Sequence, residues 1–168
     1  FPNLTLTVDP IRKNLMKEPP RKVGEKLVSG WMIALIAVIS LTAGLLALGS
    51  YIYVYGKTGD IILARSMTFI VLGFDTLIYV FSVKSLMIPF WKTNIFNNLW
   101  LVVAVILGFL LQILPFTTPQ LRQFFGLTSL SRGYWITAIV SAFIVFIIVE
   151  IFKFIYHHAT TRSLTQSL

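Results

Sequence analysis

The residue best placed to do chemistry is an aspartate, Asp75, inside the apolar run of residues 67–83. That run is about 17 residues, roughly 25 Å as a helix, which is close to the hydrocarbon thickness of a bilayer. A carboxylate at this depth costs roughly 2.5–3.5 kcal/mol to insert, so it must face protein, water or a cation rather than lipid. Asp75 is therefore a candidate cation ligand or proton-relay group, and the alternative is a buried structural acid.

Further polar side chains follow Asp75 along one helix face. Thr68, Asp75, Tyr79 and Ser82 are spaced by seven, four and three residues, which places them in one stripe. Thr76 and Tyr79 could add oxygens to a cation site at Asp75. Because a hard cation takes six or more oxygens, other helices or chains would have to complete that site.

The remaining polar groups within apolar runs are Gln112, Glu150 and Lys153. An amide in a membrane span more often joins two helices than binds a ligand, so Gln112 predicts an interhelical hydrogen bond. Glu150 and Lys153 are three residues apart near the end of the last run, a spacing that favours a local ion pair. All three are candidates for either a structural role or a place in a transport path.

The sequence contains no phosphate-binding glycine loop, nucleophile elbow or zinc-protease motif, and no cysteine. Two adjacent histidines, His157 and His158, point different ways on a helix and are a poor metal site. We therefore predict no catalytic residue and no cofactor site, and no enzymatic activity of this chain alone.

The elements that must position these residues are membrane helices. Of 168 residues, 57% are hydrophobic and 12% charged, about half the charged share of soluble domains. The apolar residues form long runs, which predict an all-α, four-helix transmembrane bundle with spans at about residues 28–55, 65–87, 98–114 and 134–156. A polar turn over residues 56–63 is predicted, with Gly56 and Gly59 as helix breakers, and a short amphipathic turn at the interface over residues 119–125.

The charge pattern gives a topology. The net charge is +8, but the cations cluster beside the apolar runs, which favours a lipid surface over a nucleic acid as partner. Four spans put both termini on one side, with a basic arm over residues 1–27 and a tail over residues 157–168. Ten of the 14 Lys and Arg residues fall on that side, which predicts cytoplasmic termini. We expect an integral protein of the plasma membrane.

The first span carries a face of small residues, Gly30, Ala34, Ala37 and Gly44. Small residues let two backbones approach closely, which is how helices often associate in lipid. This face is a predicted docking surface for another helix.

Several short motifs, in order, resemble the C-terminal transmembrane region, helices seven to ten, of the P-type cation-transporting ATPases. Residues 16–21 (MKEPPR) are similar to the family's entry into helix seven. Residues 65–69 and 82–85 bracket an eighth-like helix, and residues 94–101 resemble the start of the ninth. Pro119–Phe125, Trp135, Glu150 and Lys153 resemble the last loop and the tenth helix.

The resemblance implies a support bundle in an ion pump that ATP phosphorylates on aspartate, with ATP and Mg²⁺ bound elsewhere in the pump. Implied partners are the remaining helices and cytoplasmic domains of that pump, the bilayer and an inorganic cation, with Ca²⁺, Na⁺, K⁺, Mg²⁺ and H⁺ all open. In some calcium pumps an acid on the eighth helix is a ligand; the motifs place Ile78 nearest that position and Asp75 about one turn away. The start at Phe1 rather than Met favours a piece of a longer chain. The alternative is a complete four-span subunit or assembly factor of a transporter.

Overall fold

The computed structural model describes the backbone of residues 2–5, 29–84 and 98–165, and the side chains of 4–5, 29–84 and 98–156. The described residues are almost all helical and contain no strand. Four helices are long and apolar enough to cross a membrane, which confirms the predicted four-helix transmembrane bundle. The elements are α1 (Pro2–Thr5), α2 (Gly30–Thr58), α3 (Ile61–Val83), α4 (Leu99–Ile113), η5 (Leu114–Phe116), α5 (Pro119–Phe125) and α6 (Arg132–Thr165).

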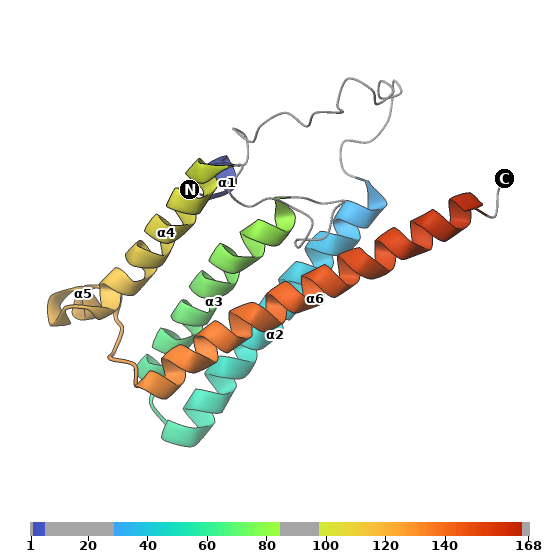
Figure 1. Ribbon diagram of the computed structural model, residues 1–168. Helices are drawn as coiled ribbons and strands as arrows, with labels where there is room; N and C mark the ends of the chain where they lie inside the picture. The colour runs from blue at the N-terminus through green and yellow to red at the C-terminus, as the bar shows by residue number, and fades with distance from the viewer. Residues whose placement is uncertain (1, 6–28, 85–97, 166–168) are drawn as a thin grey trace.

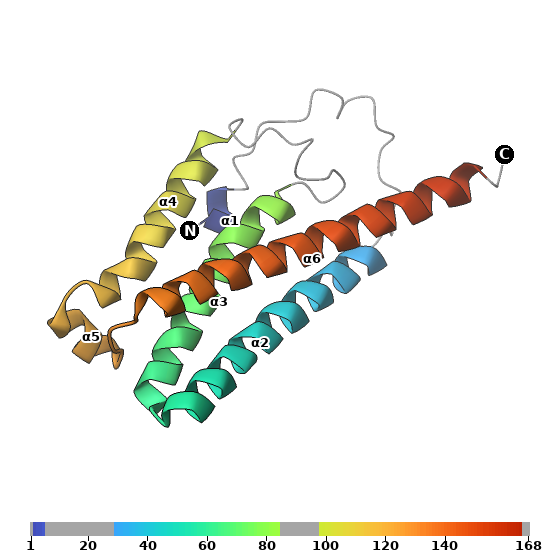
Figure 2. The ribbon, with the colours of Figure 1, turned by 60° about the horizontal axis from the view of Figure 1, so that its bottom comes forward.

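Helix α3 is the centre of the arrangement. It packs mainly against α6 and α2 and less extensively against α4. Figures 1 and 2 show α4 on one side of α3, and α6 running across α3 alongside α2. The short α5 lies at the same end of the molecule as the α2–α3 turn (Figure 1). The central helix can therefore be contacted by all three other spans.

The core is built from side chains of α3 set between small residues of its neighbours. Met67, Ile70 and Phe74 of α3 are buried against Ala47 of α2 and Ala138 of α6. Alanines at these contacts let the helix backbones approach closely, which favours packing in lipid. The outer faces of α2 and α4 instead expose large apolar side chains, among them Leu41, Leu45, Trp100 and Leu110. Such faces suit lipid or further helices.

The predicted turn between the first two spans is wrong in length. Helix α2 continues through Gly56 to Thr58, and α3 begins at Ile61, so only Gly59 and Asp60 connect them. Gly59 has φ 67° and its N–H donates to the carbonyl of Tyr55, a left-handed helix cap that glycine adopts without strain. The Asp60 side chain then accepts from two backbone N–H groups of α3. Gly56 has no such role and stays helical.

The remaining helix ends follow local signals. The segment predicted as a short amphipathic turn over residues 119–125 is a two-turn helix, α5, which Thr118 caps by accepting from the N–H of Leu121. Asn98 caps α4 by accepting from the N–H of Leu101, and its amide donates to the Thr5 carbonyl of α1. The backbone of α6 continues as helix to Thr165, into the segment predicted as a tail.

Helices α3 and α4 meet through two glycines. A Cβ on Gly73 would lie 1.9 Å from Nε2 of Gln112, and a Cβ on Gly108 would lie 2.5 Å from Cδ2 of Leu77. Gln112 uses the space beside Gly73 to donate to the Phe69 carbonyl at 2.8 Å. This confirms the predicted interhelical hydrogen bond of Gln112.

Replacing Gly73 by alanine should separate α3 from α4. The new methyl group needs the place of the Gln112 amide, so the hydrogen bond to Phe69 is lost and the contact is overpacked, at a cost of about 1–3 kcal/mol. Thermal unfolding of the membrane protein in detergent would show a lowered midpoint for G73A. The matched control is G44A, where nothing lies within 4 Å of the added Cβ, and it should unfold no earlier than the wild type.

Candidate functional site

Asp75 is 1% exposed and lies against α6. The hydroxyl of Ser141 donates to Asp75 Oδ1 at 3.1 Å and also lies 2.9 Å from the Ala138 carbonyl. One hydroxyl hydrogen therefore has two acceptors within reach. Oδ2 of Asp75 accepts no hydrogen bond from the part of the chain that the structure describes. The aspartate thus has a partner within this chain for one of its two oxygens.

A second polar contact joins the same helices nearer the end of α3. Ser82 donates to Oε1 of Glu150, and Nζ of Lys153 lies 2.8 Å from that same oxygen. Lys153 also donates to the backbone carbonyl of Ser82 at 2.9 Å. This carbonyl belongs to the last turn of α3, where carbonyls lack a partner within the helix, so the ammonium also caps α3. We call Asp75, Ser82, Ser141, Glu150 and Lys153 together the polar seam.

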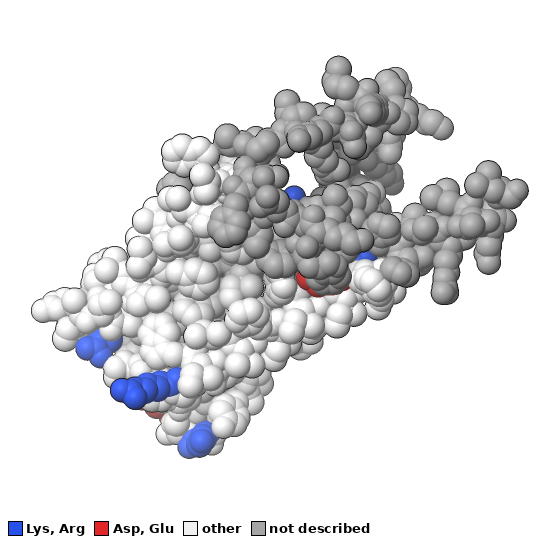
Figure 3. Space-filling view, viewed as in Figure 1, with Lys and Arg blue, Asp and Glu red and all other residues white. Residues whose placement is uncertain are grey.

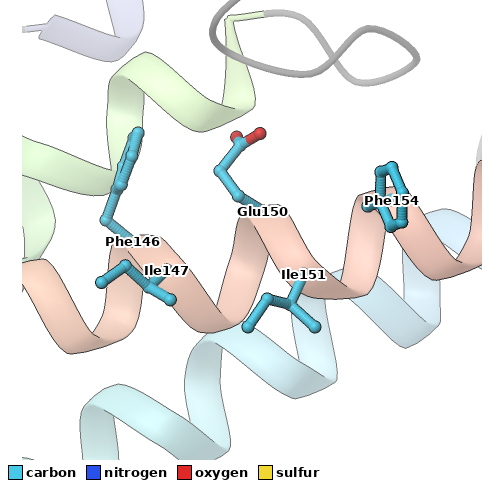
Figure 4. A pocket seen from close by; sticks show the side chains of 5 residues that line it. All are labelled: Phe146, Ile147, Glu150, Ile151 and Phe154. Carbon is cyan, nitrogen blue, oxygen red and sulfur yellow. The ribbon is translucent and has the colours of Figure 1, made fainter.

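The ion pair of the seam is deeply buried. Glu150 and Lys153 are each 4% exposed, so the predicted pairing of these two residues is present and shielded from solvent. Figure 4 shows Glu150 projecting from α6 with Phe146 toward α3. An apolar groove of about 310 Å³ adjoins this carboxylate, lined by Phe146, Ile147, Glu150, Ile151 and Phe154. Low polarity around the pair strengthens its attraction but makes loss of either partner expensive.

The other predicted site residues lie away from Asp75 or face apolar neighbours. Thr76 is exposed, its hydroxyl donates to the Leu72 carbonyl, and it lines a groove between α3 and α4 together with Gln112. Tyr79 is half-buried and packs against the apolar cluster of α2 and α6 that contains Trp31 and Val145. The structure therefore brings neither Thr76 nor Gln112 to Asp75. Within the described segments, no group of three or more His, Cys, Asp or Glu side chains could hold a metal ion.

The partners of Asp75 and Glu150 on the opposite helix were not predicted. Ser141 is the single hydroxyl in the apolar run of residues 138–149, and Ser82 belongs to the polar stripe of α3. A lone hydroxyl in a membrane helix is a signal for an interhelical hydrogen bond. The sequence did not reveal which helix Ser141 would meet, because that depends on how α3 and α6 cross.

Four membrane-length helices, with α3 joined to α6 and to α4 through buried polar groups, define the membrane domain of an integral protein. Comparison with known protein families shows that the chain belongs to the cation-transporting ATPases. Residues 1–155 match the family described as "Cation transporting ATPase, C-terminus". The resemblance seen in the sequence is thereby confirmed.

Individual relatives agree with this assignment. Calcium-transporting ATPase 1 of Bacillus cereus is 30% identical, over 91% of this chain and 19% of the relative. The endoplasmic reticulum-type calcium-transporting ATPase 3 of Arabidopsis thaliana is 28% identical, over 89% of this chain and 18% of the relative. The probable cation-transporting ATPase F of Mycobacterium tuberculosis is 22% identical, over 87% of this chain and 16% of the relative. The chain thus spans less than a fifth of the length of these relatives.

Removing one partner of the buried ion pair should be far more damaging than removing both. K153M takes the ammonium from Glu150 and from the Ser82 carbonyl, which should lower the free energy of unfolding by about 3–5 kcal/mol. The double variant E150Q/K153M removes both charges and should recover much of that loss. Unfolding in detergent measures the stability of both variants. The control is K57M, which removes an exposed charge. Equal stability of K153M and K57M would contradict the role given to the seam.

Proposed function

We propose that this chain is the membrane support domain of an ATP-driven cation pump. The observation that carries the proposal is the family match over residues 1–155. In this role the chain contributes to ion translocation together with the pump's other helices and cytoplasmic domains. ATP and Mg²⁺ act in those other parts, since we assign neither a nucleotide site nor a metal site to the described residues.

The geometry suits a rigid support. Helix α3 is tied to α6 by the polar seam and to α4 by Gln112, so its position is fixed by directed hydrogen bonds as well as by packing. In a pump that alternates access to its ion site, such a unit gives moving helices a fixed surface. The small-residue face of α2 supports this role, because Gly30, Ala34, Ala37 and Gly44 are exposed and available to a neighbouring helix.

Asp75 is the residue through which the support domain would touch the transported ion. Its Oδ2 is buried and accepts no hydrogen bond within the described chain, which suits a carboxylate that also meets a cation, a proton or a polar group of a neighbouring helix. A cation or proton bound at Oδ2 would reduce the negative charge on Oδ1 and so favour donation by the Ser141 hydroxyl to the Ala138 carbonyl. One carboxylate is only part of a cation site, so the other oxygens would come from other helices.

Replacing Asp75 by asparagine tests this role. In the full-length pump, D75N should raise the cation concentration for half-maximal ATP hydrolysis about 10–100-fold, the range typical for loss of a group that supports metal binding. The matched control is T76V, which changes the adjacent exposed hydroxyl and should leave that concentration unchanged. If D75N lowers the unfolding temperature while its cation dependence stays normal, Asp75 is a structural acid.

We also propose that the domain lies in the plasma membrane with both termini in the cytoplasm, on the strength of the cation distribution. The absence of cysteine makes the orientation directly testable with single-cysteine variants. A membrane-impermeant maleimide added to intact cells should label T117C, whose position is exposed beside α5, and should not label S163C. Labelling of S163C but not T117C would reverse the orientation without affecting the family assignment.

A further inference from the structure

One end of the bundle carries positive charge that the described residues do not balance. Lys57, Arg65, Arg122 and Arg132 lie at the end formed by the α2–α3 turn, α5 and the start of α6, with Asp60 as the acid of that turn. Asp60 is engaged as the cap of α3, accepting from two backbone N–H groups at 2.8 and 3.0 Å. Among the described residues none of the four cations forms an ion pair. Figure 3 shows the corresponding blue areas at the lower end, with little red beside them.

Two of these arginines lie at α5, since Arg122 belongs to this helix and Arg65 reaches the glycine that ends it. Nη2 of Arg65 lies 4.0 Å from where a Cβ on Gly126 would sit, and the N–H of Gly126, the cap residue of α5, bonds back to α5 carbonyls, including that of Arg122. Nε of Arg122 is buried and has no hydrogen-bond acceptor in the described structure. The N–H of Thr128 donates to Oγ of Ser66 at 2.8 Å and holds this loop on α3. A groove of about 410 Å³ results, lined by Ile62, Pro119, Arg122, Gln123, Gly126, Leu127 and Thr128.

The aromatic residues of α5 complete the surface. Phe124 is 82% exposed and Phe125 is 48% exposed, with their rings 5.2 Å apart, edge to face. They follow the end of a membrane-length helix, Leu99–Phe116, so a bilayer spanned by that helix would have its headgroups near these rings. Exposed phenyl rings next to arginines are typical of helices that rest in this interface. A water-facing loop would gain nothing from two such rings.

We infer that this end of the bundle, defined by Arg65, Arg122, Phe124 and Phe125 and called here the α5 surface, binds an anionic phospholipid. The two guanidinium groups receive the phosphate of the headgroup, because arginine presents paired donors that match phosphate oxygens. The phenyl rings enter the acyl boundary next to it. The lipid supplies the negative charge that the described residues at this end lack.

Native mass spectrometry of the full-length protein tests the α5 surface. The detergent-purified protein is titrated with phosphatidylglycerol and, separately, with phosphatidylcholine, and the dissociation constants of the first bound lipids are compared. We expect tighter binding of phosphatidylglycerol. In the R65Q/R122Q variant this preference should fall by roughly 25-fold, since each arginine near a headgroup contributes about a fivefold change. K57Q, which removes one charge from the same end but outside the groove, should change the preference by no more than about fivefold.

Two further measurements separate a lipid from other occupants. F124A/F125A should weaken phosphatidylglycerol binding although it keeps every charge, and millimolar inorganic phosphate should not displace the lipid. Displacement by phosphate would mean a free-anion site and would overturn the proposal. So would equal binding of both lipids to the wild type, a comparison that needs no variant to fold. Retention of the full preference in R65Q/R122Q would also overturn it.

Discussion

Polar groups inside the hydrocarbon region must be met by protein, and this requirement organises the whole bundle. Helix α3 is the least apolar of the four spans and also the most buried. It carries Asp75 and Ser82, which could not face lipid tails without large cost. Helices α2 and α4 carry no Asp, Glu, Arg or His, and the one Lys of α2 lies in its last turn, so both can lie at the periphery with large apolar side chains exposed. The central position of α3 follows from this difference in polarity.

The polar contacts also set how the helices are aligned. Between helices in lipid the hydrophobic effect gives little preference for one register over another, so hydrogen bonds and close packing must specify it. Asp75 with Ser141, and Ser82 with Glu150 and Lys153, fix α6 on α3 at two separated points. Gln112 beside Gly73 fixes α4 on α3 in the same way. Sliding any of these helices by one turn would leave several buried donors and acceptors without partners.

Much of this could be read from the sequence because it depends on local spacing. Apolar run lengths predict the four helices, a separation of three residues predicts the Glu150–Lys153 pair, and residues 119–125 predict the short amphipathic segment that forms α5. The length of the α2–α3 turn was mispredicted, because glycine tolerates a helix interior and only Gly59 adopts the left-handed conformation. The Asp75–Ser141 contact was not predictable, since residues 66 positions apart meet only through the crossing of two helices. Helix geometry already separates the adjacent side chains of Asp75 and Thr76 by about 100°, so the suggestion that Thr76 adds an oxygen at Asp75 overlooked a local constraint.

Charged side chains are accommodated differently at the two ends of the bundle. Near the C-terminal end of α3, Lys153 is neutralised by Glu150 on the same helix and holds the last turn of α3, so charge there is internal and serves packing. At the α5 end, Asp60 is the one acid among the described residues and caps α3, while Arg65 is exposed and Nε of Arg122 has no acceptor within the described structure. Glu150 and Lys153 belong to the same helix and can stay paired when that helix moves as a unit, whereas an exposed cation depends on what the surroundings supply. The seam therefore suits a part that stays fixed, and the opposite end suits contact with the membrane surface.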